Sequence, residues 1–338
     1  MQLKDRLLRK ATLIAAGNKT IRNLIERSQI SLDFPAHIFI EPTNICNLKC
    51  RMCPQAEPSD VKRGLMDFNI FKKVIDESVT HGRRTSIFFH KDGEPLIHPQ
   101  LFDMISYAVE RKASYRTHLS TNAQLLDEEK AEKLLVSGID SIIVNIDANE
   151  EDTYMLIKGK GGLSEVEKNV RNLIFQRNRS GKAKPMIRVK LILVDANQEE
   201  VEEFRKKWEN IADEVVIGRE FQWPGSKQGE SASSDSQTRR YPCISLWLSM
   251  AVNWDGSVSL CCIDYYHKGI IGDVKKNTLE SIWKSDDLKK LRKAHIMGEY
   301  GNSGICCKCQ GLWVRDTLGI GSEKWLAKKM KKAGLWNE

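Results

Sequence analysis

Three cysteines within eight residues constrain this chain more than any other feature of its sequence: Cys46, Cys50 and Cys53. They follow an apolar, strand-like run over residues 37–43, so they belong to a loop at the end of a strand. Three thiolates can hold three irons of a cubane cluster and leave the fourth iron open to an outside ligand. Structural zinc needs a fourth protein ligand, and residues 54–80 contain neither Cys nor His. The spacing therefore favours an iron–sulfur site over a zinc knuckle or a chance grouping.

The other cysteines are also clustered. All nine lie at positions 46–53, 243–262 and 306–309, a pattern that favours metal binding in a reducing compartment over disulfides. The net charge of +8 is concentrated at the termini, with +4 in residues 1–34 and +3 in residues 310–338. The body is therefore nearly neutral, and no nucleic-acid partner is expected. Without a long apolar run or an apolar signal core, we expect a cytoplasmic protein with no transmembrane segment.

From residue 37 onward, strand-like and helix-like blocks alternate, which predicts an α/β fold with a parallel sheet and right-handed crossovers. The chemistry of such a sheet is expected at the carboxyl ends of its strands. Strands are predicted at 37–43, 86–90, 116–120, 141–146, 186–194 and 214–221, and helices near 68–80, 98–111, 127–137, 163–177 and 198–210.

The cysteine loop and this sixfold alternation resemble those of the radical S-adenosylmethionine (SAM) enzymes, which have a partial (β/α)6 barrel. The resemblance implies that the open iron of a [4Fe–4S] cluster takes the amino and carboxylate groups of SAM. An electron from an external flavodoxin-like or ferredoxin-like donor then cleaves SAM to a 5′-deoxyadenosyl radical. That radical removes a hydrogen atom from a substrate carbon.

The same resemblance implies SAM contacts after the second and third strands. Gly93 and Glu94, in a Gly-Glu-Pro sequence, correspond to the family's contact with the methionyl amine, although Asp92 replaces the usual first glycine. Glycine permits close backbone approach, and a carboxylate accepts from an ammonium group. Ser120 and Asn122 correspond to the family's contacts with the ribose and the methionine carboxylate. A simple turn at Gly93 and an Asx-type helix cap at Asn122 are the structural alternatives.

Polar residues also follow the fourth strand and occupy the fifth. Asn145 and Asp147 are expected on one strand face, towards the ribose or substrate, with a helix N-cap as the alternative role for Asp147. Arg188 and Lys190 alternate onto one face of the fifth strand, where a buried cation needs an anionic partner. The SAM carboxylate and a substrate anion are the candidates, and solvated edge residues are the alternative. Residues 158–162 are predicted to be a flexible basic loop.

The second cysteine set follows a polar, Ser-rich stretch. Asp255-Gly256 between two apolar runs predicts a hairpin that brings Cys243 towards Cys261, and a helical run then leads to Cys306 and Cys309. Four thiolates from a hairpin and a C-x2-C sequence can close a metal site. This region resembles the short SPASM or twitch auxiliary-cluster domain. The resemblance implies that Cys243, Cys261, Cys306 and Cys309 hold a second [4Fe–4S] cluster, with structural zinc as the alternative.

Two cysteines, Cys262 and Cys307, are then left over. We expect them to pack beside the cluster, and Cys262 is a candidate hydrogen-atom donor, as in radical epimerases. The predicted units are an amphipathic N-terminal helix (1–34), the barrel (35–221), a linker (222–242), a hairpin and helix auxiliary domain (243–309) and a basic helical tail (310–338). The terminal units are expected to pack on the body, with peripheral membrane contact or partner binding as alternatives.

The resemblance implies a radical SAM oxidoreductase or epimerase. Because a separate peptide-recognition domain is not expected, we predict a dehydrogenase or epimerase acting on a sugar-like or aminocyclitol-like small molecule. A peptide-modifying maturase is the alternative within the family. A non-catalytic iron–sulfur electron carrier or zinc scaffold is the alternative from another class.

Overall fold

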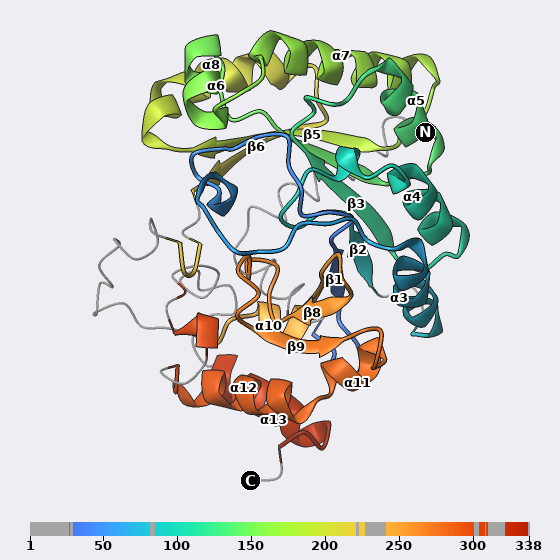
Figure 1. The fold of residues 1–338 in the computed structure, drawn as a ribbon, viewed down its shortest axis with the longest axis vertical. Coiled ribbons are helices and arrows are strands. Elements are labelled where there is room, and N and C mark those ends of the chain that lie inside the picture. The colour runs from blue at the N-terminus through green and yellow to red at the C-terminus, as the bar shows by residue number, and fades with distance from the viewer. Residues whose placement is uncertain are drawn as a thin grey trace.

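The computed structural model describes residues 27, 30–81, 85–220, 223–226, 241–300, 304–307, 309 and 322–336. These residues form a nine-stranded sheet in the order β6-β5-β4-β3-β2-β1-β7-β8-β9 (Figure 1). Most of the predicted N-terminal helix, most of the predicted linker and residues 310–321 lie outside the described residues. No helix among the described residues is long and apolar enough to cross a membrane.

Six parallel strands make up the first part of the sheet, as the alternation predicts. Each falls within one of the predicted strand ranges or extends it by one residue, which confirms the α/β fold class. The strands are β1 (His37–Ile40), β2 (Ser86–Phe88), β3 (Arg116–Thr121), β4 (Ser141–Asn145), β5 (Met186–Leu193) and β6 (Glu214–Arg219).

Helices connect these strands. The predicted ones are α3 (Phe68–Thr80), α4 (Leu101–Glu110), α5 (Glu128–Val136), α7 (Leu163–Arg179) and α8 (Val201–Trp208). Four further helices were not predicted: α6 (Glu151–Lys158) and the short 3-10 helices η1 (Pro54–Ala56), η2 (Pro95–Ile97) and η3 (Asp195–Glu200). The prediction of a flexible basic loop over residues 158–162 is wrong at its first residue, because Lys158 is the last residue of α6 and is buried. Gly159 then terminates the helix with a φ of 71°.

The strands have two different faces. Alternate residues such as Ile38, Leu119 and Val189 are fully buried with the apolar side chains of the helices. The residues between them, such as His118 and Arg188, are half-buried and form what we call the inner face of the sheet. This period of two sorts apolar side chains to the helix-covered face. It leaves polar side chains on the inner face, below the carboxyl ends of the strands.

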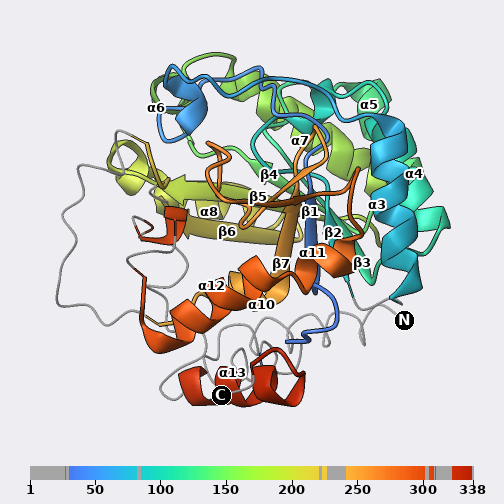
Figure 2. The same ribbon diagram turned by 60° about the horizontal axis from the view of Figure 1, so that its bottom comes forward.

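The C-terminal region continues the same sheet. Strand β7 pairs in parallel with β1, β8 pairs antiparallel with β7, and β9 pairs antiparallel with β8. The predicted hairpin turn is present, with Gly256 at a φ of 86°. Figure 1 shows the C-terminal helices α11–α13 at the end of the molecule away from α6–α8, and Figure 2 shows α13 next to α12. The elements are α10 (Ser245–Leu248), β7 (Ser249–Val252), β8 (Ser257–Ser259), β9 (Ile270–Asp273), α11 (Leu279–Trp283), α12 (Asp286–Met297), η4 (Gly304–Cys306) and α13 (Ser322–Lys332).

The tail helix α13 packs on the body, as expected for residues 322–336. Leu326 and Met330 on one side of it are fully buried, and α13 lies against α12. The Lys329 ammonium donates to the carbonyl oxygen of Ile30. The tail therefore covers part of the body with its apolar side and keeps most of its lysines outward.

Candidate active site

The first three cysteines lie in the loop between β1 and η1, where all three are half-buried and none forms a disulfide. The loop is held by its own turn, in which Cys53 N donates to Cys50 O at 2.9 Å. It is also held by α6, because Arg51 N donates to Ile157 O at 2.8 Å. Burial raises the pKa of the Cys50 thiol, and it raises those of Cys46 and Cys53 to about 11 and about 12. Thiolates here need a cationic partner, so three converging sulfur donors fit a metal cluster.

Gly93 lets two backbone segments meet at this loop. A Cβ on Gly93 would lie 2.2 Å from Thr43 O and 2.7 Å from Ile45 O, so another side chain would force the backbone apart. The next residue, Glu94, donates its N–H to Ile45 O at 2.9 Å. Glycine is therefore required to seat the turn after β2 against the cysteine loop. Its contact with SAM stays a prediction.

The Glu94 carboxylate is fully buried and joins three segments. It accepts from Thr121 Oγ1 at 2.7 Å, from Asn122 N at 2.8 Å and from Leu96 N at 3.2 Å. Burial raises the pKa of Glu94, and the three hydrogen bonds oppose that effect. The carboxylate thus fixes the end of β3 relative to the turn after β2. A further bond to the SAM amine stays a prediction.

Asn122 reaches directly from the end of β3 to the cysteine loop. Its Nδ2 donates to Asn47 Oδ1 at 2.9 Å and lies 3.9 Å from Cys46 Sγ. Its Oδ1 accepts from Gln124 N at 3.0 Å, which is the Asx turn considered as an alternative. Asn122 therefore makes the turn and also contacts the loop. Ser120 and Asn145 lie beside it on the inner face, and Asn145 Nδ2 donates to Ser120 Oγ at 2.8 Å.

Two predictions about Asp147 are wrong. Strand β4 ends at Asn145, and Asp147 has a φ of 67°, so the two side chains do not alternate along one strand. The N-cap of α6 is Glu150, so Asp147 does not cap that helix. Its carboxylate instead pairs with Lys158 Nζ at 2.5 Å and accepts from Ile192 N at 2.7 Å. These contacts fix the β4–α6 connection to β5, and a catalytic role for Asp147 stays a prediction.

Sequence reasoning missed Lys158. Its ammonium is buried, donates to Asn145 O at 2.9 Å and pairs with Asp147. Its charge also favours the thiolate form of Cys50, opposing the effect of burial on that pKa. The signal was present in the sequence, because Lys158 follows Tyr154 and Ile157 at helical spacing on the buried side of α6.

Arg188 and Lys190 lie on the inner face, and they alternate along β5 as predicted. Arg188 Nη2 donates to Ser141 Oγ at 3.0 Å. No ion pair joins either cation to an acidic side chain within the described ranges. The anionic partner expected for them is therefore not supplied by the part of the protein that the structure describes.

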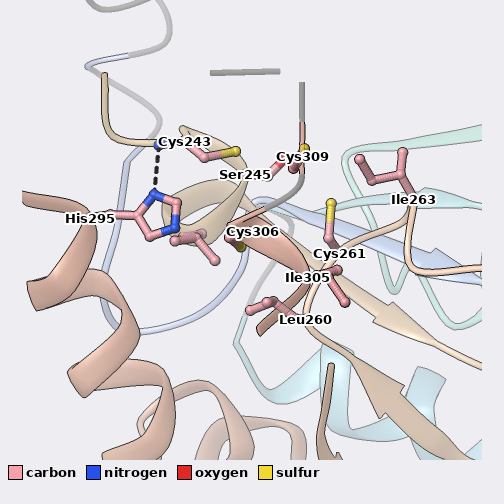
Figure 3. Close-up of a pocket in the computed structure, with 10 residues that line it drawn as sticks. Cys243, Ser245, Leu260, Cys261, Ile263, His295, Ile305, Cys306 and Cys309 are labelled. Atoms are coloured by element: carbon pink, nitrogen blue, oxygen red, sulfur yellow. Dashed lines mark hydrogen bonds between the residues drawn. The ribbon is translucent and has the colours of Figure 1, made fainter. Parts of the chain in front are cut away.

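The second cysteine set meets at one pocket. Cys243 and Cys261 line it together with Cys306 and Cys309, and Figure 3 shows the four side chains around the same space. Apart from Ser245 and His295, the other lining residues are apolar: Leu246, Leu260, Ile263 and Ile305. His295 Nδ1 accepts from Cys243 N at 3.3 Å. Four sulfur donors in an apolar shell fit a closed iron–sulfur cluster.

The two remaining cysteines lie differently. The interaction between the adjacent Cys261 and Cys262 thiols lowers the pKa of Cys261 and raises that of Cys262. The charge of Lys91 acts on both thiols, so the pair lies close to the turn after β2. Cys307 is exposed, and its Sγ lies 2.9 Å from Gly304 O. A hydrogen-atom transfer by Cys262 stays a prediction.

Polar contacts fix the first cysteine loop against the segment that follows Cys262. Arg63 donates to Asn44 O and to the Tyr265 hydroxyl, both at 2.7 Å. Lys91 Nζ donates to Asp264 O at 3.2 Å, and its side chain is fully buried. Both cysteine sites are therefore held by one connected structure.

Comparisons with known proteins agree with this arrangement. The sequence model of the radical SAM superfamily matches residues 40–174, and that of the SPASM iron–sulfur cluster-binding domain matches residues 243–310. A tungsten-containing aldehyde ferredoxin oxidoreductase cofactor-modifying protein of Pyrococcus furiosus is 25% identical over 54% of this chain and 50% of its own length. An S-adenosyl-L-methionine-dependent 2-deoxy-scyllo-inosamine dehydrogenase of Niallia circulans is 22% identical over 82% of this chain and 94% of its own length.

Solved structures share the fold. The crystal structure of BtrN in complex with AdoMet and 2-DOIA has a TM-score of 0.56 and 20% identity, and covers 82% of this chain and 94% of BtrN. Streptococcus suis SuiB bound to precursor peptide SuiA has a TM-score of 0.62 and 16% identity, and covers 85% of this chain and 74% of SuiB.

The two domain types imply three cofactors: a [4Fe–4S] cluster that binds SAM, auxiliary iron–sulfur clusters, and SAM itself. The converging thiols at both sites suit that assignment. Residues 40–174 therefore belong to the radical SAM superfamily, and residues 243–310 belong to the SPASM family of iron–sulfur cluster-binding domains.

Proposed function

We propose that this protein is a radical SAM oxidoreductase that removes a hydrogen atom from a carbon of a sugar-like or aminocyclitol-like small molecule. When bound, the first cluster and SAM supply a 5′-deoxyadenosyl radical for this step. The second cluster site is proposed to accept the substrate electron, which would make the net reaction a dehydrogenation. An external flavodoxin-like or ferredoxin-like protein is the proposed electron donor, and redox-neutral epimerisation is the alternative outcome.

The observation that carries this proposal is the polar inner face next to the first cysteine loop. Ser120 and Asn145 lie there side by side, and the side chain of Asn122 reaches Cys46. Hydroxyl and amide groups both donate and accept hydrogen bonds, as recognition of a polyhydroxylated molecule requires. The similarity to the Niallia circulans dehydrogenase, which extends over most of both chains, supports the same substrate class.

This chain's own residues hold the proposed reaction in place. Lys158, Asp147 and Glu94 fix the ends of β3, β4 and β5 around the cysteine loop through buried hydrogen bonds. Half-buried thiols and a largely buried strand face limit access of water to a reactive species. The protein's contribution is therefore positioning and exclusion of competing reactions.

A peptide-modifying maturase is a second candidate. It is supported by the fold similarity to SuiB, whose structure was solved with its precursor peptide. This candidate predicts binding of a short precursor peptide, whereas the main proposal predicts turnover of a cyclitol or sugar. A non-catalytic electron carrier or zinc scaffold predicts no SAM cleavage.

The test is anaerobic reconstitution followed by addition of SAM and dithionite. We expect about eight irons per chain, as two [4Fe–4S] clusters require, together with 5′-deoxyadenosine. Cys50→Ala should abolish 5′-deoxyadenosine formation, while Cys307→Ala, at an exposed cysteine, serves as the matched control. Zinc in place of iron, or no cleavage by the wild-type protein, would overturn the proposal. Cyclitols, sugars and short peptides are then compared for substrate-dependent product.

A further inference from the structure

Four basic side chains share the inner face of the sheet. Arg188 and Lys190 alternate along β5, His118 lies on β3 and His90 follows β2. The cationic charges of Arg188 and Lys190 both act on His90, and that of Arg188 also acts on His118. The Phe88 ring stacks on His118 with a centroid separation of 4.5 Å and lies 5.8 Å from His90, so the two histidines flank one aromatic side chain.

Buried polar atoms of this group lack hydrogen-bond partners. His90 Nδ1, His118 Nδ1 and Arg188 Nε are buried and unpartnered within the described residues. The Lys190 ammonium likewise has no hydrogen bond or ion pair to any residue that the structure describes. Leaving a buried polar atom unsatisfied is costly, so buried polar atoms nearly always have a partner. Three such atoms on one face of the sheet, on β3, on β5 and after β2, indicate a polar ligand on that face.

The nearby acids do not neutralise these cations. Glu214 is the register partner of Arg188 on β6 and raises its pKa, but no ion pair joins them in the described part of the chain. Asp147 acts on Lys190, but its carboxylate is already engaged by Lys158 and Ile192 N.

The protonation behaviour of the group agrees with a surplus of positive charge. Burial lowers the pKa of both Arg188 and Lys190. Burial and the neighbouring cations lower the pKa of His90 to about 3 and that of His118 to about 4. A bound anion would oppose these decreases in pKa, because a nearby negative charge favours the protonated forms.

The four side chains do not all lie at one depth along the strands. The Arg188 guanidinium donates to Ser141 Oγ at the first residue of β4, and His118 is the register partner of Ser141. Lys190 is instead the register partner of Asn145, the last residue of β4. Four residue steps along a strand span about 13 Å. The group therefore extends along the inner face from the end of β4 to its first residue, and Arg188 and His118 form its deep end.

We propose that Arg188, Lys190, His90 and His118 bind a carboxylate or phosphate group of the substrate on the inner face of the sheet, with Arg188 and His118 at the deep end of the site. This inference rests on the proposed function, in which the substrate occupies the inner face. It narrows the substrate class to anionic sugars or cyclitols, such as a sugar acid or a sugar phosphate. The anionic group anchors one end of the molecule, so the reacting carbon lies at the other end, towards the cysteine loop.

The test measures anion binding directly. Reconstituted, SAM-bound protein is titrated by calorimetry with inorganic phosphate and, separately, with acetate, which distinguishes a phosphate site from a carboxylate site. We expect at least one anion to bind with a stoichiometry near one. Arg188→Gln and Lys190→Gln should each weaken that binding at least tenfold. Arg205→Gln and Lys206→Gln, on the exposed side of α8, are the matched controls and should leave it unchanged.

Parallel measurements separate this inference from the proposed function. SAM affinity and uncoupled 5′-deoxyadenosine formation should change less than twofold in both variants. If they fall together with anion binding, the group serves the SAM carboxylate and the inference is overturned. If wild-type protein binds neither anion but still cleaves SAM, the inference fails and the proposed function stands. His118→Gln provides a second binding test if an Arg188 variant does not retain iron.

Discussion

Lys158 and Asp147 form an ion pair that solvent hardly reaches, with side chains 3% and 4% exposed. The pair is further satisfied by Asn145 O and by Ile192 N, so both charges have partners. Burial opposes the charged form of Lys158, and Asp147 more than compensates, so the pKa of Lys158 is raised. Removing one partner would leave the other charge buried and unpaired, which is far costlier than losing a surface pair.

Lys158→Met should therefore lower the free energy of unfolding by about 3–5 kcal/mol. The double variant Lys158→Met with Asp147→Asn should recover more than half of that loss, because no buried charge remains. Asparagine also tolerates the positive φ at position 147. Anaerobic guanidinium unfolding, followed by circular dichroism, measures both changes.

Lys133→Met is the control for this experiment, because Lys133 pairs with Glu129 on an exposed helix surface. It should change the unfolding free energy far less than Lys158→Met does, because an exposed ion pair contributes little. A single Lys158 variant as stable as this control would show that the buried pair does not hold the β4–α6 connection.

At the scale of elements, local sequence patterns predicted strands and turns, but they did not predict contacts between elements that are distant in sequence. The alternation of apolar residues located all six barrel strands, and Asp255-Gly256 located the hairpin turn. Helix α6 was missed because Met155 and Leu156 are exposed on it, which blurs its apolar stripe. The Lys158–Asp147 pair and the deep position of Arg188 depend on how separate elements meet. The repeat of apolar residues along a single element predicts neither feature.

The auxiliary site illustrates how elements assemble a ligand set. Cys243 precedes α10, Cys261 follows β8, and Cys306 and Cys309 lie in and after η4, yet all four line one pocket. Cys307 lies between two of them in sequence but is exposed. Position in the fold, and not the number of nearby cysteines, therefore distinguishes the predicted ligands.

Cys243→Ala should remove about four of the eight irons, the content of one cubane cluster, and should leave SAM binding intact. Cys307→Ala should keep all of them, which makes it the matched control for a cysteine change in the same region. Iron and sulfide analysis with absorbance spectroscopy measures the difference. Equal iron content in the two variants would contradict the assignment of the auxiliary ligands, and bound zinc in the wild-type protein would reassign the metal.

At the scale of the whole molecule, β1 joins the two predicted units. It pairs with β2 on one edge and with β7 on the other, so residues 37–40 lie between strands far away in sequence. Glu41, directly after β1, is fully buried and accepts from Asp92 N at 3.3 Å and from Trp254 N at 3.1 Å. Lys91 supplies the nearby positive charge, although burial still raises the pKa of Glu41 to about 8.

This junction makes the barrel dependent on the C-terminal region. Residues 1–242 alone would expose the edge of β1 and lose the Trp254 N–H that stabilises Glu41. An exposed edge and a poorly compensated buried carboxyl group both disfavour independent folding. We therefore predict that full-length protein unfolds in a single calorimetric transition. We also predict that the fragment 1–242 lacks a cooperative transition and does not hold the first cluster.

The matched control keeps every residue and breaks only the chain. Co-expressed fragments 1–232 and 233–338, divided within the Ser-rich stretch, should assemble and recover both the transition and the iron, because the β1–β7 pairing needs no covalent link. If fragment 1–242 folded cooperatively by itself and retained the first cluster, the two units would be separate domains. In that case the shared sheet would be a docking contact, and not a requirement for the barrel.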